Sequence, residues 1–353
     1  MMMRESKNLK RWYLLQLLQT KSPINEHMTL FWHNHFTSSL EKVEQPKLLF
    51  QQNQLLRKHA LGNFESMLRA IARDPAMLVY LDGNENVIGA PNENFARELL
   101  ELFTLGRGQY TESDIKAAAI AFTGWGVNFN TGQFAYEPAA HDPREVVFLG
   151  KRGKFSGDDI ISILLEHPRT AENIAEKFWK EFISDERPNP RVVKHWGNVF
   201  RNSNYNISVL YKSVLMSDLF WAKHNRGSLT KSPIDLVVGS FRTLPYPKLP
   251  DTQLVHILKL LGQDLFDPPT VKGWRGGKSW IDTQTLLVRT SLVNKITRHS
   301  KQAINVDKNL PRTTGEEVVR WLLPLPPVLS LPRVPGRIRM VRALMLDPVY
   351  QMK

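Results

Sequence analysis

The sequence contains no cysteine among its 353 residues. Structural disulfides, thiolate metal sites and cysteine nucleophiles are therefore excluded, and the chain suits an oxidising or a reducing compartment equally well. No uninterrupted apolar run approaches the roughly 20 residues that a spanning helix requires, so we expect no membrane span. The first twenty residues interrupt their leucines with Gln16 and Gln19 and have no small-residue cleavage site. This pattern favours an amphipathic helix over a secretory signal, so the sequence as written is expected to be soluble and cytoplasmic.

Several catalytic sequence motifs are also missing. The chain has no Walker-type phosphate loop, no Rossmann glycine fingerprint after a strand, no Gly-x-Ser-x-Gly elbow and no His-Glu-x-x-His zinc helix. Any catalytic chemistry must therefore come from residues outside these motif classes.

Acidic residues are outnumbered in this chain. Its 47 Lys and Arg against 34 Asp and Glu give a formal net charge of +13, which permits an anionic ligand such as nucleic acid, an acidic glycan or a membrane surface. The stretch from Asp82 to Asp114 is acidic, so the basic excess lies elsewhere, notably in the final segment with Arg333 and Arg342. No nucleic-acid-binding module is recognisable, so we do not expect nucleic acid to be the partner.

Helical periodicity dominates what is present. Apolar residues at spacings of three and four predict helices over Leu9–Leu18, Ile24–Phe36, Lys47–Ala60, Phe64–Ala72, Ser113–Phe122, Ala171–Ile183, Ile207–Leu215, Pro233–Leu244, Leu254–Leu261 and Ile338–Leu346. Thr111 with Asp114 resembles a capping box at one helix start. The fold class predicted is mainly α: a multi-helical globular bundle with a core supplied by the 42% hydrophobic content.

The stretch 124–157 differs from the rest. Alternating apolar residues around the turn sequence "NTG" predict a β-hairpin, and a second extended piece, "VVFLGKRGKFSG", follows it. No repeat of fixed period is found, which disfavours a solenoid. We expect one compact unit with four parts: an N-terminal helical block at 1–123, the β insert at 124–157, a second helical block at 158–323, and a proline-rich connector with a C-terminal helix at 324–353.

The segment "GAPNENFARELLELFTLG", 89–106, contains a polar stripe. At about 100° per residue, Asn94, Arg97, Glu98 and Glu101 share one sector and the apolar residues take the opposite one. One interpretation is a solvated helix face supported by Glu93–Arg97 and Arg97–Glu101 ion pairs. The other is that Glu98 and Glu101 line a cleft beside Asn94 and Arg97, as a general acid and base or as metal ligands.

The motif "FWHNHF" offers partners for those carboxylates. His33 and His35, with Glu98 and Glu101, would supply nitrogen and oxygen ligands for a divalent metal ion. Two histidines two residues apart diverge on a continuous helix, so both reach one ion only if the helix ends there. The alternative is that one histidine packs in the core and the other is exposed.

Two loops carry further candidates. In "AHDPRE", Asp142 could orient the imidazole of His141 for catalysis, although a His-Asp pair beside a proline is also ordinary turn chemistry. In "VKGWRGGKSWID", Lys272, Trp274 and Trp280 form either a substrate platform, in which the tryptophans stack and the cations hold an anion, or a tight connection whose tryptophans fill the core. Asn92, at the start of the Asn92–Glu101 block, joins the candidate substrate-binding residues.

The order of these blocks resembles the bacterial domain of unknown function 1800 family. The blocks that carry the resemblance are "MTLFWHNHFTSS", "ALGNFESMLRAIARDPAMLVYLDGNEN", "GAPNENFARELLELFTLGRGQYTESDI", "AFTGWGVNF", "FSGDDIISILL", "KSPIDLVVGSFRTL", "LGQDLFDPPTVKGWRGGKSWI" and "ALMLDPVYQ". They cover nearly the whole chain. One departure is Arg275 in "GWRGG", where the family pattern would be "GWPGG".

The resemblance implies little biochemistry, because the family is uncharacterised. Its members are typically longer at the amino terminus, commonly carry an export signal, and often lie beside genes of a family that resembles sulfatases and alkaline phosphatases. It therefore implies a periplasmic or exported protein whose export signal and upstream helices are missing from this sequence, through a misassigned start or because this is a short form.

Two functions remain in competition. The first is a hydrolase-like enzyme of the cell envelope that acts on a glycan or another envelope polymer through a carboxylate and histidine cleft. The second is a non-catalytic helical partner or scaffold for a sulfatase- or phosphatase-like companion protein. The resemblance favours a role for the Asn94–Glu101 stripe beyond solvation, although carboxylates paired with Arg97 inside a helical core would also serve structural specificity.

Overall fold

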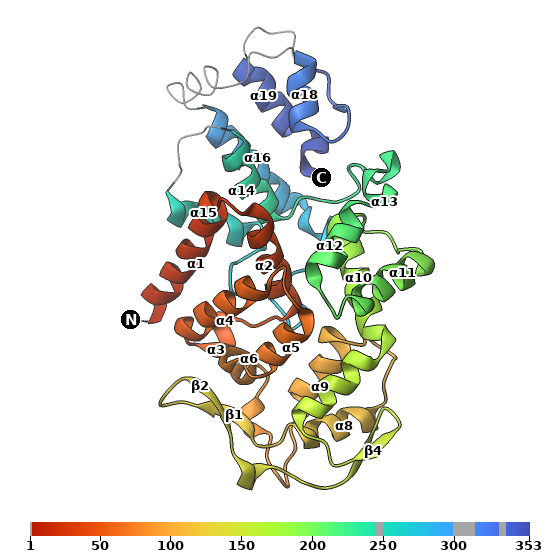
Figure 1. The fold of residues 1–353 in the computed structure, drawn as a ribbon. Helices are drawn as coiled ribbons and strands as arrows, with labels where there is room; N and C mark the ends of the chain where they lie inside the picture. The colour runs from red at the N-terminus through yellow and green to blue at the C-terminus, as the bar shows by residue number, and fades with distance from the viewer. Residues whose placement is uncertain (1, 245–249, 299–314, 332–336) are drawn as a thin grey trace.

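Helices dominate the computed structural model, which describes residues 2–244, 250–298, 315–331 and 337–353 (Figure 1). The first half contains α1 (Met2–Gln19), α2 (Pro23–His35), α3 (Leu40–Val43), α4 (Pro46–His59), α5 (Phe64–Ala72), α6 (Pro75–Tyr80), α7 (Asn94–Glu98), α8 (Glu112–Ala121) and α9 (Gly157–Glu166). The second half contains α10 (Pro168–Phe182), α11 (Pro190–Asn202), α12 (Ile207–Leu215), α13 (Asp218–Trp221), α14 (Pro233–Thr243), α15 (Asp251–Leu260), α16 (Thr283–Arg298), α18 (Gly315–Leu322) and α19 (Arg337–Leu346). The mainly α fold class is confirmed.

Two small antiparallel hairpins interrupt the helices. β1 (Trp125–Asn128) pairs with β2 (Gln133–Tyr136), and β3 (Val146–Phe148) pairs with β4 (Lys151–Gly153). Gly132, at a positive φ of 68°, closes the first hairpin at the predicted "NTG" turn. The predicted β insert is therefore present as two separate hairpins. Residues 332–336 of the predicted proline-rich connector lie outside the described part of the chain.

Local sequence signals account for the helix starts. Thr111 and Asp114 form the predicted capping box at the start of α8, each side chain bonding the backbone N–H of the other. Pro23, Pro168 and Pro190 occupy the first positions of α2, α10 and α11, where the absent N–H of proline costs no helical hydrogen bond.

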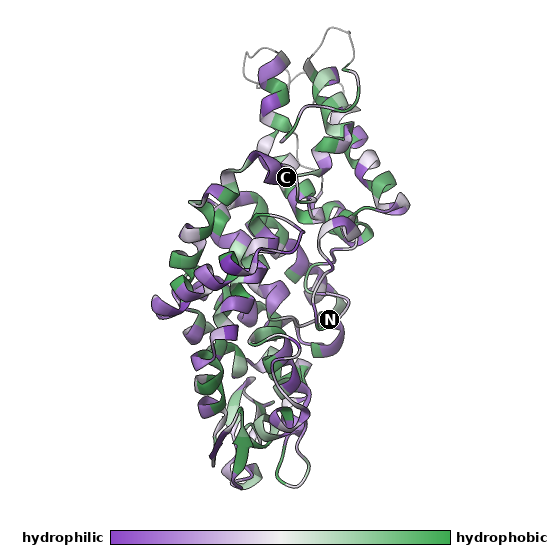
Figure 2. Cartoon of the chain, turned by 90° about the vertical axis from the view of Figure 1, so that its right-hand side faces the viewer, coloured by the Kyte–Doolittle hydropathy of each residue, from purple (hydrophilic) through white to green (hydrophobic). Residues whose placement is uncertain are grey.

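The molecule is elongated in both views (Figures 1 and 2). The hairpins with α8 and α9 lie at one end, α16, α18 and α19 lie towards the other, and α1 to α6 lie between them. α10 packs on α11 and α12 along one side, while α1 packs against α14 and α15. In the described ranges no helix is both long and apolar enough to cross a membrane.

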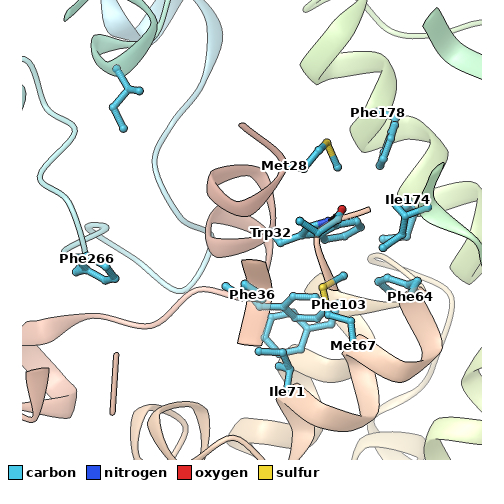
Figure 3. Close-up of a cluster of buried hydrophobic side chains, with 14 of the residues drawn as sticks. Met28, Trp32, Phe36, Phe64, Met67, Ile71, Phe103, Ile174, Phe178 and Phe266 are labelled. Carbon is cyan, nitrogen blue, oxygen red and sulfur yellow. Dashed lines mark hydrogen bonds between the residues drawn. The ribbon is translucent and has the colours of Figure 1, made fainter. Parts of the chain in front are cut away.

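The core centres on the indole of Trp32 in α2, which is fully buried (Figure 3). Its Nε1 donates a hydrogen bond to the carbonyl of Ala60 at 2.9 Å, which satisfies the polar atom of the ring. Phe64 of α5 and Phe178 of α10 pack on this indole, and Phe103 packs on the neighbouring Phe36. This core ties the motif "FWHNHF" to the segment 94–103 and to α10.

Candidate functional site

The segment 94–103 changes its winding part-way along. α7 ends at Glu98 and the chain continues as η2 (Leu99–Phe103), a π-helical turn. The hydroxyl of Thr104 donates to the carbonyl of Leu99 at 2.6 Å and closes this wider turn. Single π-helical turns inside helices are rare and are frequent at functional sites.

Arg97 binds its neighbours at the protein surface. Its guanidinium contacts Glu93 at 2.9 Å and Glu112 at 2.7 Å. The predicted Glu93–Arg97 pair is confirmed, whereas the predicted Arg97–Glu101 pair is wrong because the π-helical turn rotates Glu101 away. Arg97 therefore fastens α7 to α8.

Asn92 and Asn94 hold the loop that precedes α7. The side-chain amide of Asn94 donates to Asp82 at 2.7 Å, and Asp82 also accepts from Lys42 at 2.8 Å. The backbone N–H of Asn92 donates to the side-chain oxygen of Asn86 at 2.9 Å. The side-chain oxygen of Asn92 in turn accepts from the backbone N–H of Asn94 at 2.9 Å, so the side chains of both candidates hold the loop in place.

Glu101 collects several donors from different parts of the chain. Arg107 Nε donates to its Oε1 at 2.5 Å, and Tyr110 donates to its Oε2 at 3.2 Å. Lys272 Nζ, from the tryptophan loop, lies 3.8 Å from Oε1. The carboxylate side chain is only 14% exposed. The structure therefore brings together two predicted residues, Glu101 and Lys272, and adds Arg107 and Tyr110, which sequence reasoning missed although both follow within nine positions of Glu101.

Glu98 has a different environment. Its side chain is half-buried, and among the described residues its carboxyl has no hydrogen-bond partner. Burial raises the pKa of Glu98, and the neighbouring charge of Glu101 adds to this, against the opposing effect of Lys272. Glu98 also contributes to raising the pKa of Tyr80, after the larger effect of burial. Glu98, Glu101, Arg107, Tyr110 and Lys272 are called the carboxylate cluster below.

Asn34 places Lys272 in that cluster. Its side-chain oxygen accepts a hydrogen bond from the backbone N–H of Trp274 at 2.8 Å. Gly273, between them, has a positive φ of 81°, and a Cβ there would lie 2.1 Å from the same oxygen. Only glycine fits this conformation and this approach. The important polar residue of "FWHNHF" for the carboxylate cluster is therefore the central asparagine, which sequence reasoning missed.

α10 carries a second set of residues that sequence reasoning missed. Arg169, Asn173 and Lys177, spaced by four on one face, donate to the carbonyls of Leu105, Thr104 and Leu102 at 3.3, 2.6 and 2.8 Å. These are carbonyls that the end of η2 would otherwise leave unsatisfied. Burial lowers the pKa of Lys177 to about 7. In the sequence nothing distinguishes these three residues from the other polar residues of α10, which include Glu172, Glu176, Lys180 and Glu181.

His33 and His35 do not face one ion. The ring of His33 packs between Phe266 and Trp274, while Nδ1 of His35 lies 2.7 Å from Lys177 Nζ. Both rings are buried, and burial lowers both pKa values, that of His33 to about 4. Across the described ranges, no group of three or more His, Asp or Glu side chains could hold a metal ion. The predicted metal set of His33, His35, Glu98 and Glu101 is therefore not assembled, because the two rings diverge along α2.

The buried His33 predicts a pH dependence of stability. The unfolded chain binds a proton at this side chain below its ordinary pKa of 6.5, whereas the folded protein does so only near pH 4. The free energy of unfolding should therefore fall as pH drops through this window, by on the order of 2 kcal/mol between pH 7 and pH 5 from this group. Urea unfolding at both pH values measures the loss. His33→Gln should reduce it, and replacing the exposed His195 by glutamine should not.

The two tryptophans of the 271–282 loop are buried. Trp274 is 5% exposed and packs on His33, and Trp280 is 8% exposed. Neither ring offers an open face to a sugar or a base, so the structure supports the core-filling interpretation. Of the three candidates in this loop, only Lys272 is exposed.

His141 and Asp142 form a separate turn. His141 Nδ1 lies 3.1 Å from the carbonyl of Thr123, and Asp142 pairs with Arg144. This pairing lowers the pKa of Asp142. Within the described residues no hydrogen bond or ion pair joins this turn to the carboxylate cluster. These contacts are those of an ordinary turn, which was one of the two interpretations of His141 and Asp142 from the sequence.

A family model described as "Protein of unknown function (DUF1800)" matches residues 2–343. The chain belongs to the DUF1800 family. No match is found among curated proteins or among solved structures. The DUF1800 match spans the whole carboxylate cluster and the Asn34 and α10 contacts that hold it in place.

Proposed function

We propose that this DUF1800 protein is an acid–base enzyme of the hydrolase type, with Glu98 and Glu101 as its two catalytic carboxyl groups. The observation that carries the proposal is the contrast between these neighbours. Glu98 has a raised pKa and no hydrogen-bond partner in the described chain, whereas Arg107, Tyr110 and Lys272 surround Glu101 with donors. Pairs of titratable groups in such contrasting environments are typical of acid–base sites.

The environments assign a role to each group. A protonated Glu98 donates its proton to the leaving-group oxygen as the bond breaks. The Glu101 carboxylate accepts a proton from the water that attacks the atom to which this leaving group is bonded. The Lys272 side chain, 54% exposed, provides a cation for an anionic group of the substrate. We propose a glycan or another envelope polymer as substrate and a location outside the cytoplasm, and the location rests on family resemblance.

The test is a paired substitution. Glu98→Gln with Glu101→Gln keeps the size of both side chains but removes the acid and the base, so release of soluble fragments from purified envelope polymer should fall to background. Chromatography of the fragments measures the release. The matched control, Glu44→Gln, changes an exposed carboxylate that makes no ion pair in the described chain and should retain release. Unchanged release by the double variant would refute the proposal, provided that both variants melt at the wild-type temperature.

The second candidate is the scaffold for a sulfatase- or phosphatase-like companion. The observation in its favour is that Asn92, Asn94 and Arg97 are all used in contacts within the protein. If the chain is a scaffold, the purified companion should co-elute with it in gel filtration, and the double glutamine variant should co-elute equally well. Neither the wild-type chain nor the double variant should then degrade the polymer.

A further inference from the structure

The stretch from Arg187 to Lys231 is strongly basic. It contains one acidic residue, Asp218, and eight cations: Arg187, Arg191, Lys194, Arg201, Lys212, Lys223, Arg226 and Lys231. The excess within this stretch accounts for much of the formal net charge of +13. It covers α11, α12 and α13, which lie along one edge of the molecule (Figure 1).

These cations are not neutralised by the protein. Lys212, Lys223 and Arg226 are exposed. In the described chain no ion pair involves them or the preceding cations of the stretch, whereas nearby Arg169 and Lys353 each pair with carboxylates. Unpaired cations gathered on one surface produce a positive potential that attracts an anionic partner.

Apolar side chains are exposed among these cations. Val209, Lys212 and Met216 fall on one stripe of α12 and the residue after it, at spacings of three and four. Met216 is 72% exposed and Val209 is 39% exposed. Scattered exposed apolar residues need no explanation, but here they are interleaved with unpaired cations.

Trp221 extends this apolar surface. Its side chain is 72% exposed, although its Nε1 donates to the carbonyl of Leu215 at 2.9 Å. That hydrogen bond fixes the indole beside the carbonyl of Leu215, the last residue of α12. Figure 1 shows α13, which ends at Trp221, at the periphery of the molecule. Val209, Lys212, Met216, Trp221, Lys223 and Arg226 are called the α12–α13 face.

We infer that the α12–α13 face docks on an anionic lipid bilayer. Tryptophan favours the headgroup level of a membrane, methionine and valine fit the boundary of the acyl chains, and Lys and Arg bind lipid phosphates. Nucleic acid is the weaker match, because methionine and valine do not stack on bases as aromatic rings do. Charge and apolar exposure thus point to the same occupant, independently of the carboxylate cluster.

Vesicle co-sedimentation of the whole protein tests this inference. The protein should sediment at low salt with vesicles of equimolar phosphatidylcholine and phosphatidylglycerol, but not with phosphatidylcholine alone. Each of Lys212→Glu, Lys223→Glu and Arg226→Glu should weaken binding by about fivefold or more, as expected for a cation near an anionic surface. Trp221→Ala should weaken binding at all salt concentrations.

Matched controls lie outside the face. Trp321→Ala removes another exposed tryptophan, on α18, and Lys47→Glu reverses another exposed cation, on α4. Both should bind as the wild type does. The inference is overturned if phosphatidylglycerol vesicles fail to sediment the protein, or if the face variants bind as tightly as the controls. It is also overturned if the same variants lose binding to random duplex DNA while vesicles are not bound.

Discussion

Glu98→Gln should be rescued by a substrate whose leaving group needs no proton, whereas Glu101→Gln should not be. On the polymer each single variant should lose about 10²–10⁴-fold in turnover, the usual contribution of a general acid or base. A nitrophenyl glycoside of the released sugar leaves as a stabilised anion, so proton donation from Glu98 becomes unnecessary. Activation of water by Glu101 remains necessary. Initial rates on both substrates measure the difference.

The raised pKa of Glu98 adds a second measurement. If Glu98 must be protonated, activity on the polymer should decline as pH rises through a pKa above the ordinary range of a glutamate. The basic limb should disappear from the profile on the nitrophenyl substrate, where the acid is not needed. An unaltered basic limb on that substrate, or equal losses for both variants on both substrates, would contradict the assigned roles. Glu44→Gln should follow the wild-type profile throughout.

Helices with a clear apolar period were the predictable part of this fold. The predicted ranges Phe64–Ala72 and Ile207–Leu215 coincide with α5 and α12. In both, an asparagine immediately before the helix caps its first turn through its side-chain oxygen. Periodicity and cap are both local, so the sequence contains all the information that these boundaries require.

The winding of 94–103 could not be predicted in the same way. Its apolar residues have the spacing of an α-helix, and nothing within the segment indicates the wider turn of η2. The donors that satisfy the carbonyls after this turn are Asn173 and Lys177, some seventy residues later. Helical periodicity depends only on residues within the segment, so it predicts Glu101 beside Arg97 and does not reflect these distant donors.

The carboxylate cluster was predictable only in part. Glu98, Glu101 and Lys272 were candidates because charged groups in apolar or glycine-rich surroundings are noticeable in a sequence. Their meeting depends on Asn34, whose side chain holds the backbone of Trp274. The histidines on either side of Asn34 suggested metal binding, but an amide that bonds a distant backbone has no recognisable sequence motif.

Gly273→Ala should destabilise the protein by about 3 kcal/mol and detach Lys272 from Glu101. A side chain at the positive φ of Gly273 costs roughly 1–2 kcal/mol, and crowding in a packed site costs about as much again. The new Cβ would lie 2.1 Å from the side-chain oxygen of Asn34 and 2.7 Å from its carbonyl, so the loop must move. Urea unfolding measures the stability, and fragment release measures the effect on the cluster.

Gly276 in the same loop offers the matched control. It has no positive φ, and a Cβ there meets nothing within 4 Å, so Gly276→Ala should change neither stability nor turnover. Asn34→Ala separates the two causes of strain, because it removes the side-chain oxygen but leaves the carbonyl and the backbone conformation. Asn34→Ala should lower the free energy of unfolding by less in the Gly273→Ala variant than in the wild type, since the two residues are in contact. If Gly273→Ala and Gly276→Ala unfold alike, the close approach of Asn34 does not hold this loop on the carboxylate cluster.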